Sequence, residues 1–446
     1  MRENALYLHQ HLKNRKKMKL INVTVGGFTN IEKVSLSITQ MCALLSYNNY
    51  GKSNVLNAIL FGLKFLRADS TEKNDKMRRS INYIPINNVT AGNDYEFEME
   101  MEAQDKSVVT YGYRFAWPKK NRAPHITAEY LKIKGSEDTK SKSHIRRDVD
   151  TCVYLSSISG RCSSKLEIQQ NQLAINKLSN FDNLFYIETI KEILDLNIVE
   201  TNTLADPTTF FRTITIFDDK VSYSGDIHEI PDFGSCAYFI YNLKKTSVHK
   251  YSLLQDAIKQ LIPNIEAFEP VKVNLKEQVK FKDDKNLPFY FPEYIYDIRV
   301  KERSLNQQIT IEKLSAGTKK IFYILLMAVA ANLNSAPLMV IEELENSIHP
   351  SLFQKLLTTI RALAGNTKII FTSHSPYLLQ YIKPEMLYIG IPNSNGIAAF
   401  KRLKNTKIST LMKEASSVDM SLGDYIFDML LDIDEISDDL VTKYFD

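Results

Sequence analysis

Cysteine is scarce in this chain, and its spacing indicates neither a disulfide framework nor a zinc site. The 446 residues contain four cysteines, and no two of them form a Cys-x-x-Cys pair. Cys42 lies in an apolar stretch and is most simply explained as a core residue. Because disulfide frameworks belong to oxidising compartments, we expect a reduced, cytoplasmic protein.

Long apolar runs are also absent. The N-terminus is polar and carries four basic residues within Lys13–Lys17, where a secretory signal would need an apolar core. No segment has the length and apolar content expected of a membrane span. The sequence therefore predicts a globular protein that is neither secreted nor membrane-spanning, with no membrane partner.

Other absences exclude coiled-coil arms, nucleases and metal hydrolases. No heptad pattern runs long enough for an extended coiled coil. A nuclease domain near the end of the chain would need its own acidic cluster, and too few residues follow Arg402 to hold one. No constellation of histidine and cysteine marks a metal hydrolase. The net charge of +4 is small for this length and does not by itself indicate a nucleic-acid partner.

What the chain does contain is a phosphate-binding loop near its N-terminus, Ser46–Ser53. Residues 42–45 read as a short buried strand, and residues 54–66 read as an apolar helix. A tight loop between such a strand and helix points backbone N–H groups at a phosphate, at the positive end of the helix. The flanking elements make a P-loop a better explanation than a chance Gly-Lys-Ser.

Each residue of this loop has an expected task. Gly51 permits close approach of the phosphates, Lys52 reaches the β- and γ-phosphates, and Ser53 offers its hydroxyl to Mg²⁺. Ser46 stands where such loops usually begin with glycine, which leaves less room. The residues predicted to bind ATP are Asn48, Asn49, Gly51, Lys52, Ser53, Asn54, Ser315 and Gly317.

The last two of these residues belong to the tetrapeptide Leu314–Gly317, which stands just before a long helical run at 318–333. A serine in an N-cap position followed by a glycine places backbone donors at a helix N-terminus, which suits a phosphate. By itself the tetrapeptide is better explained as a plain capping sequence. Its downstream neighbours favour the phosphate-binding interpretation.

The first of these neighbours is a carboxylate pair. Residues 338–341 read as a buried strand that ends in Glu342 and Glu343. Two carboxylates at such a position are costly to bury without a cation. We expect Glu342, together with Ser53, to hold Mg²⁺, and Glu343 to activate the attacking water. Aspartate is more usual at the first position, so Glu342 is expected to slow turnover.

A histidine follows the next strand. Residues 351–364 show the apolar spacing of a helix, and residues 368–372 read as a strand that leads to His374. This histidine is either a loop residue or a catalytic group that contacts the γ-phosphate and orients water, and the context favours the second. His349, before Pro350, is predicted to be structural.

Taken together, these stretches resemble the ABC-type ATPases of the RecF, SMC and OLD group. The matching segments are Gly51–Ser53 for Walker A, Leu314–Gly317 for the signature, Ile341–Pro350 for Walker B and the D-loop, and Thr372–Pro376 for the H-loop. Residues 19–38, with Gly27 and Phe28, look like the family's opening strands. The string Glu345–Pro350 is closer to OLD-like and bacterial defence ATPases than to membrane transporters.

The resemblance implies ATP and Mg²⁺ as cofactors, and a homodimer or higher even homo-oligomer that sandwiches ATP. Ser315 and Gly317 would then act on the ATP of a partner subunit. The leading hypothesis is a slow ATPase that acts as sensor or regulator of a separately encoded effector, a nuclease or toxin, as in antiphage systems such as Septu or PARIS. The alternatives are a RecF-like DNA-repair ATPase and a non-hydrolysing ATP-binding scaffold.

The expected fold is α/β, an ABC-type P-loop NTPase head of mixed sheet and helices with an inserted α+β region and a short acidic helical C-terminus. The predicted segments are 1–130 and 266–405 for the head, 131–265 for an inserted, mainly helical region, and 406–446 for the C-terminus. Residues 95–103 and 108–116 alternate like paired strands. Residues 135–147 are polar and read as an exposed loop, 184–198 as a helix and 210–224 as a strand.

Two further features have open interpretations. Basic clusters at 67–79 and 140–147 either line a DNA path or lie in solvated loops. The acidic, amphipathic segment 419–446 is either a closing helix pair packed on the head or a docking site for a basic protein partner.

Overall fold

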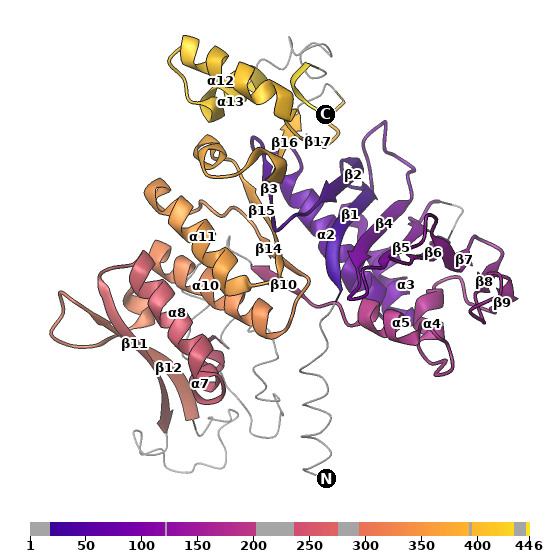
Figure 1. Cartoon of the computed structure of the whole chain (residues 1–446), viewed down its shortest axis with the longest axis horizontal. Helices are drawn as coiled ribbons and strands as arrows, with labels where there is room; N and C mark the ends of the chain where they lie inside the picture. Colours follow the sequence, from indigo (N-terminus) through magenta and orange to yellow (C-terminus); the bar gives the residue numbers. More distant parts are fainter. Residues whose placement is uncertain (1–17, 121–122, 202–235, 275–293, 392–394, 432–442) are drawn as a thin grey trace. The chain divides into compact units, whose positions relative to one another are not determined.

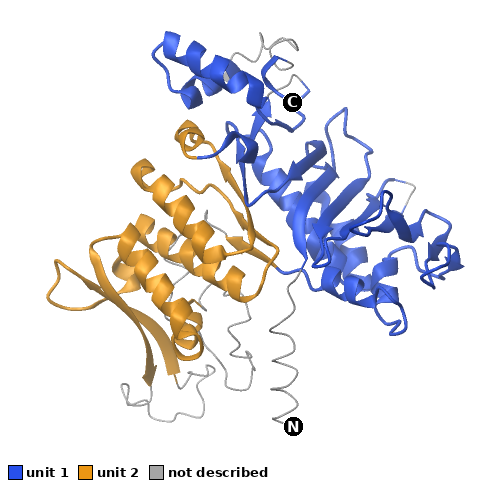
Figure 2. Ribbon diagram, viewed as in Figure 1, with its two compact units in different colours: residues 1–197, 382–446 blue, residues 198–381 orange. Residues whose placement is uncertain are grey.

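The computed structural model describes residues 18–120, 123–201, 236–274, 294–391, 395–431 and 443–446. The chain forms two compact units, residues 1–197 with 382–446 and residues 198–381, which Figure 2 colours separately. Both contain sheets and helices, so the predicted α/β class is confirmed. The four predicted segment boundaries stay a prediction.

The first unit contains an eight-stranded antiparallel sheet in the order β2-β1-β4-β5-β6-β7-β8-β9 (Figure 1). Its strands are β1 (Lys19–Phe28), β2 (Ile31–Ser37), β4 (Tyr95–Glu102), β5 (Val108–Ala116), β6 (His125–Lys134), β7 (Lys142–Arg147), β8 (Cys152–Tyr154) and β9 (Ser164–Lys165). The predicted opening strands at 19–38 and the predicted pair at 95–103 and 108–116 are confirmed.

Alternation explains why these strands form a one-sided sheet. In β4 every second residue is buried, and the buried ones include Tyr95 and Phe97. The Tyr95 ring packs with Phe61 of helix α2 (Lys52–Arg67) and with Phe115 of β5, and the Phe97 ring packs with Tyr113 of β5. One apolar sheet face against one apolar helix is the usual two-layer solution for a domain core.

A second group of strands in the first unit carries the phosphate-binding loop. The strand β3 (Met41–Leu45) is completely buried and pairs in parallel with β16 (Leu387–Ile391). The strand β17 (Ala399–Lys401) then pairs antiparallel with β16. The strand predicted at 42–45 and the helix predicted at 54–66 are confirmed as β3 and α2. Full burial explains why β3 is a continuous apolar run.

The remaining helices of this unit are short. They are α3 (Ser70–Arg79), α4 (Ala174–Leu178), α5 (Ile187–Leu194), α12 (Ile408–Ser417) and α13 (Leu422–Leu431). The last two pack on each other and follow β17. The chain end is tied to the strand region by a β-bridge between Leu403 and Phe445.

The second unit is built on three parallel strands, in the order β10-β14-β15. They are β10 (Ile198–Thr201), β14 (Leu338–Ile341) and β15 (Lys368–Ser373). The helices α10 (Ala316–Leu333), α11 (Phe353–Ala364), α7 (Cys236–Thr246) and α8 (Val248–Leu261) pack in the same unit, beside the antiparallel strands β11 (Ile265–Asn274), β12 (Tyr294–Glu302) and β13 (Ile309–Thr310). The strands predicted at 338–341 and 368–372 and the helices predicted at 318–333 and 351–364 are confirmed.

Among the described residues, α10 alone is long and apolar enough to cross a membrane by length and composition. Residues 319–331 are all buried inside the second unit, as expected of a core helix. A single helix of this kind is weak evidence for a membrane span, since core helices pass the same test.

Two sequence predictions need correction. Residues 135–147 are not all loop, because Lys142–Arg147 form β7, which pairs with β6 and buries Ile145. The charged side chains mask the strand pattern, and pairing with the preceding strand β6 stabilises the strand. The helix predicted at 184–198 is shorter, Ile187–Leu194, and the chain enters β10 at Ile198. The strand predicted at 210–224 lies outside the described residues.

Candidate functional site

In the P-loop, the ammonium group of Lys52 contacts backbone carbonyl oxygens of the same loop. Lys52 Nζ donates to the carbonyl oxygens of Ser46 and Tyr47, each at 2.7 Å, and lies 3.4 Å from Ser46 Oγ. Lys52 is the first residue of α2 and is 6% exposed. The loop therefore holds a buried cation beside a helix N-terminus, an arrangement that attracts anions.

The backbone of the loop needs left-handed conformations at two positions. Gly51 has φ +90° and Asn49 has φ +66°. A Cβ on Gly51 would lie 2.6 Å from Cβ of Ala398 and 3.0 Å from Oδ1 of Asn30. Glycine is therefore required at position 51 for space as well as for conformation, which explains the glycine of the Gly-Lys-Ser sequence.

The packing also explains how serine fits at position 46. A Cβ on Gly390 of β16 would come within 2.6 Å of Ser46 Cβ. Because Gly390 has no side chain, it leaves room for the side chain of Ser46. A glycine is therefore not needed at position 46 for space. The loop departs from the common pattern without a clash, because a neighbouring strand compensates.

The other predicted ATP-binding residues of the loop lie on its outer side. Asn48, Asn49 and Ser53 are exposed. Asn54 is half-buried, and its amide donates to Oδ1 of Asn30 at 2.8 Å. Asn30 was not predicted from the sequence, since it follows β1 and stands far from the loop along the chain.

The loop also contacts the C-terminal helix of the same unit. The Tyr47 hydroxyl donates to the carbonyl oxygen of Phe427 on α13 at 2.8 Å, and the two rings pack edge to face at 5.0 Å. The acidic C-terminal segment is thus packed on the head at this point, as the closing-helix interpretation predicts.

In the second unit, the residue after β14 that is predicted to activate water has an unusual backbone. Glu343 has φ +45°, which is uncommon for a residue other than glycine. Its N–H donates to Oγ1 of Thr372 at 2.9 Å, and its carbonyl accepts from Nζ of Lys320 at 2.9 Å. Contacts on both sides hold this strained conformation, and such residues cluster at functional sites. Glu342 precedes it and is half-buried.

Lys320 is 1% exposed and lies on α10. Burial lowers its pKa from the usual 10.5 to about 8, against the opposing effect of the Glu345 and Glu343 carboxylates. Sequence analysis missed this residue, although a lysine inside an apolar core helix is a usable signal.

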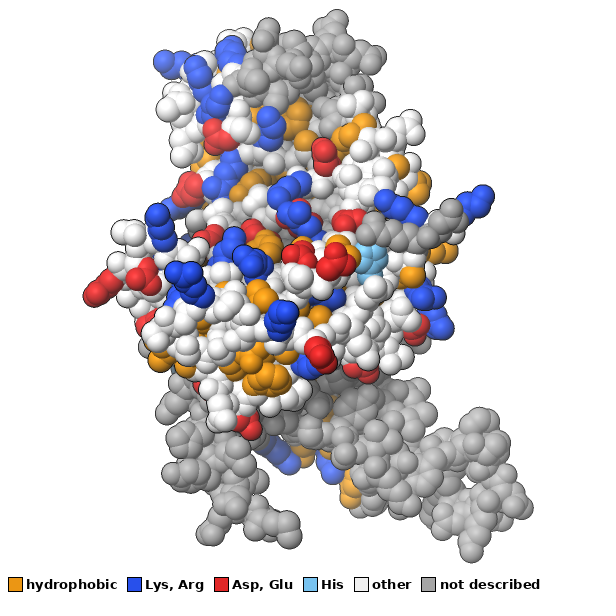
Figure 3. Space-filling model, turned by 90° about the vertical axis from the view of Figure 1, so that its right-hand side faces the viewer, with side chains coloured by type: hydrophobic (Ala, Val, Ile, Leu, Met, Phe, Trp, Pro, Cys, Tyr) orange, Lys and Arg blue, Asp and Glu red, His pale blue; other side chains and the backbone are white. Residues whose placement is uncertain are grey.

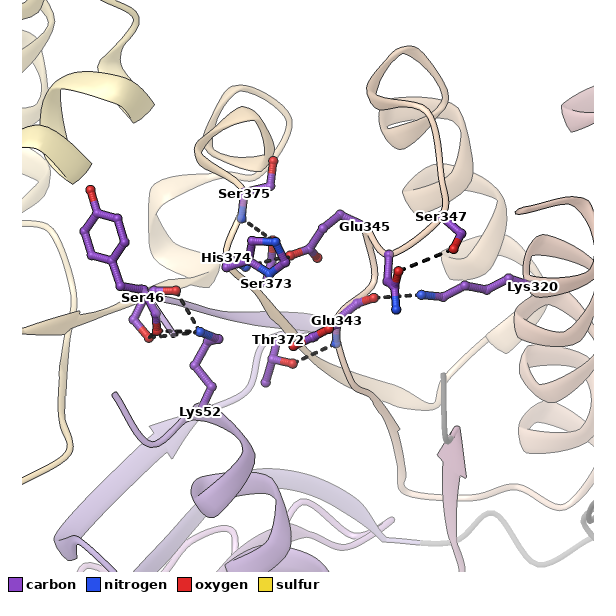
Figure 4. A network of polar contacts seen from close by, with 12 residues as sticks. Ser46, Lys52, Lys320, Glu343, Glu345, Ser347, Thr372, Ser373, His374 and Ser375 are labelled. Carbon is purple, nitrogen blue, oxygen red and sulfur yellow. Dashed lines mark hydrogen bonds and ion pairs between the residues drawn. The ribbon is translucent and has the colours of Figure 1, made fainter. Parts of the chain in front are cut away.

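The side chains of Glu345 and His374 are in direct polar contact in the same unit (Figure 4). Oε1 of Glu345 lies 2.9 Å from Nδ1 of His374 and accepts from the backbone N–H of His374 at 2.6 Å. The sequence placed Glu345 in a motif but gave it no task. The structure makes it the direct partner of the predicted catalytic histidine.

The signature tetrapeptide caps α10, as predicted. Ser315 is the N-cap residue, and its Oγ accepts from the N–H of Thr318 at 3.2 Å. A Cβ on Gly317 would lie 2.3 Å from the carbonyl oxygen of Ser347. Glycine at this position therefore lets the signature approach the loop after β14. His349 has the structural task predicted for it, since its ring caps the turn that begins at Pro350.

The structure thus groups the predicted site residues within each unit. The first holds Asn48, Asn49, Gly51, Lys52, Ser53 and Asn54, and the second holds Ser315, Gly317, Glu342, Glu343 and His374. The part of the chain that the structure describes has no cluster of three or more His, Cys, Asp or Glu side chains suited to a metal. Magnesium at a P-loop needs no such cluster, because phosphate and water oxygens supply most of its ligands.

Part of each basic cluster is unavailable to a nucleic-acid phosphate, although others of its residues, such as Arg78 and Arg146, are exposed. Lys73 and Arg147 are buried, and Arg147 donates to the carbonyl oxygens of Gln169 and Gln172. On the face shown in Figure 3, basic and acidic side chains are interspersed over the described residues. These observations favour the solvated-surface interpretation over a DNA path.

Comparison with known families gives one match. Residues 48–380 match the family described as "AAA domain, putative AbiEii toxin, Type IV TA system", and since this is well over half of the chain, the protein belongs to that family. The predicted membership of an AAA-type ATPase family is confirmed. The likeness to antiphage ATPases stays a prediction. A search of curated proteins found no match.

Among solved structures, the chain is similar to heads of SMC proteins. The SMC head bound to the C-terminal winged-helix domain of ScpA is 14% identical with a TM-score of 0.47, covering 88% of this chain and 99% of that one. The SMC head domain from Thermotoga maritima is 14% identical with a TM-score of 0.41, covering 87% and 100%. The head from Pyrococcus furiosus, bound to the C-terminal domain of ScpA, is 13% identical with a TM-score of 0.45, covering 90% and 100%.

Proposed function

We propose that this AAA-family chain binds ATP with Mg²⁺ and hydrolyses it slowly, and that this cycle regulates a separately encoded effector. The observation that carries the proposal is the position of Lys52 Nζ, held by the Ser46 and Tyr47 carbonyls at the start of α2. Replacing two carbonyl partners by phosphate oxygens exchanges dipoles for full charges, which strengthens each contact.

In this proposal each site residue has a separate role in ATP hydrolysis. The loop N–H groups and Lys52 bind the β- and γ-phosphates, and Ser53 and Glu342 hold Mg²⁺, which neutralises charge on the phosphates. Glu343 accepts a proton from the attacking water, and His374 orients that water. Ser315 and Gly317 contact the ATP of a partner subunit in a homodimer or higher even oligomer.

The regulatory part rests on the family and on what the chain lacks. The family description names a putative toxin of a type IV toxin–antitoxin system, which is a system of two separate components. The sequence contains no nuclease motif of its own. A role in antiphage defence is the form of regulation that we propose.

Glu343→Gln tests the enzymatic part. We expect phosphate release to fall by about 10²–10⁴-fold, the usual contribution of a general base, while fluorescent-ATP binding stays within a few-fold of the wild type. Lys52→Ala is expected to lose binding. Glu385→Gln, an exposed carboxylate near Lys383, is the matched control and should keep full activity. Unchanged phosphate release in Glu343→Gln would refute the assignment.

The regulatory part is tested with the same variant, because blocked hydrolysis accumulates the ATP-bound state. Tagged Glu343→Gln protein is purified with MgATP from cells that carry the native gene neighbourhood, and the eluate is treated with nuclease. A stoichiometric protein that stays bound, and is lost from Lys52→Ala, supports an effector. Nuclease-sensitive DNA without such a protein would replace the effector by a DNA-maintenance role.

A further inference from the structure

The contact between Glu345 and His374 involves one carboxylate oxygen and two nitrogens of the same residue. Oε1 accepts from the backbone N–H of His374 at 2.6 Å and lies 2.9 Å from ring atom Nδ1. Figure 4 shows the ring directly beside this carboxylate. Because both the backbone and the ring are held by one atom, the orientation of the ring relative to the chain is fixed.

The contact also determines the tautomer. An ionised carboxylate has no hydrogen to donate, so Nδ1 must carry the hydrogen of this bond. In the neutral ring, Nε2 is then left as an acceptor. The His374 side chain is 45% exposed, whereas that of Glu345 is 7% exposed. The ring therefore has a buried anchoring side and an accessible side.

Burying the Glu345 carboxylate costs free energy. Packing alone does not require a charged side chain at this position. Oε2 of Glu345 is buried and has no hydrogen-bond partner among the described residues. The ammonium of Lys320 offsets part of the cost, since it interacts electrostatically with Glu345. A buried carboxylate with one unsatisfied oxygen is expected where a function requires it.

We propose that Glu345 is a positioning residue, which holds His374 as the Nδ1–H tautomer so that Nε2 accepts a hydrogen bond from the attacking water. The inference deepens the proposed function and rests on it for the identity of the reaction. The tautomer itself does not depend on hydrolysis and is measured separately.

The tautomer is tested by ¹⁵N NMR of the full chain labelled at its eight histidines, with the His374→Gln variant to assign the signal. We expect the wild type to show His374 protonated at Nδ1, and Glu345→Ala to lose this preference. Glu345→Gln keeps an accepting oxygen and should retain it. A His374 protonated only at Nε2 in the wild type would overturn the proposal, whatever the ATPase activity.

Kinetics then separate positioning from a general structural effect. We expect Glu345→Ala to lower kcat about 10-fold or more, with KM within about 3-fold, because misorientation affects the reacting geometry rather than binding. Glu345→Gln should recover most of kcat. Glu266→Gln, an exposed carboxylate paired with Lys301 at 2.8 Å in the same unit, is the matched control and should leave kcat unchanged.

A double-mutant cycle gives the deciding comparison. If Glu345 acts through His374, Glu345→Ala should add no further loss of kcat in the His374→Gln background. Full additivity of the two losses would assign Glu345 an independent role and overturn the proposal. If Glu345→Ala does not fold, the same cycle is run with Glu345→Met, which fills a similar space but has no carboxylate oxygen to accept from His374. An inactive wild type with the Nδ1–H tautomer would refute the proposed ATPase function but leave the anchoring contact intact.

Discussion

At the scale of single residues, the burial of two lysines costs folding free energy, and this cost depends on pH. Lys73 is 1% exposed and its ammonium donates to the carbonyl oxygens of Leu66 and Ala68, near the end of α2. Burial lowers its pKa from 10.5 to about 8, opposed by the nearby Glu129 carboxylate. Lys320 in the second unit shows the same shift. In each case the folded protein disfavours the charged form.

This shift predicts the sign of a pH effect on the first unit. Between about pH 8 and pH 10.5 the unfolded chain holds the Lys73 proton and the folded protein has lost it, so stability rises with pH in this window. We expect the difference in unfolding free energy, wild type minus Lys73→Met, to increase by about 2 kcal/mol from pH 8 to pH 9.5.

Urea titrations followed by the fluorescence of Trp117, the single tryptophan, measure this difference. Trp117 is 2% exposed and belongs to the first unit, so its signal reports on the unit that contains Lys73. Tyr95 and Tyr113 of the folded protein stay neutral in this pH range, because burial raises their pKa values well above 10. Parallel curves for the two proteins would contradict the prediction.

At the scale of elements, α2 lies close to the antiparallel sheet because one helical residue lacks a side chain. A Cβ on Gly62 would lie 2.2 Å from the ring of Phe97 and 2.5 Å from the hydroxyl of Tyr95. The carbonyl of Gly62 also accepts from the hydroxyl of Tyr113 at 2.7 Å. The position of the helix that begins with Lys52 therefore depends on glycine at this point.

Gly62→Ala tests this packing against helix propensity. Propensity alone predicts about 1 kcal/mol of stabilisation, whereas overpacking costs typically about 1–3 kcal/mol. Because the clash involves rings that are themselves buried, we expect net destabilisation in urea titrations read by Trp117. Asn57→Ala on the same helix is the control and should change stability by less than about 1 kcal/mol. If Gly62→Ala is more stable than the wild type, the rings of the sheet must shift to accommodate the added methyl group.

At the scale of the whole molecule, the proposed oligomer combines motifs from different subunits. Ser315 is exposed at the N-terminus of α10, and the P-loop residues Asn48, Asn49 and Ser53 are exposed in the other unit. If the signature of one chain contacts ATP on its partner, two inactive variants can complement each other. This follows from two-fold symmetry, in which each site takes one motif from each subunit.

The complementation test mixes Lys52→Ala with Ser315→Arg. Each variant alone should be inactive, whereas mixed dimers contain one intact site, which restores about a quarter of the wild-type rate per chain at equal amounts. Phosphate release over a series of mixing ratios measures this. Lys52→Ala mixed with Lys52→Ala/Ser315→Arg is the control and should stay inactive. Absence of recovery in the first mixture would place the signature on its own subunit's ATP, or outside the site.

The sequence by itself determined the elements whose evidence is local. Continuous apolar runs marked β3, β14 and β15, helical spacing marked α2, α10 and α11, and the residues at their ends marked the P-loop and the carboxylate pair. These patterns can be recognised in the sequence because buried residues recur with the period of the helix or strand that they form. The AAA family followed from the same short motifs, and the family match confirms it.

Only the tertiary structure decided the features that depend on contacts between distant residues. Gly390 makes room for Ser46, β6 turns the charged stretch Lys142–Arg147 into a strand, and Glu345 anchors His374. Gly390 and Glu345 stand many residues away from their partners, and the β6–β7 hairpin is masked by the charged residues of its second strand, so no local pattern records these contacts. Burial decided them as well: Lys73 and Lys320 look like surface residues by type, yet the fold encloses both because their ammonium groups find carbonyl oxygens inside it.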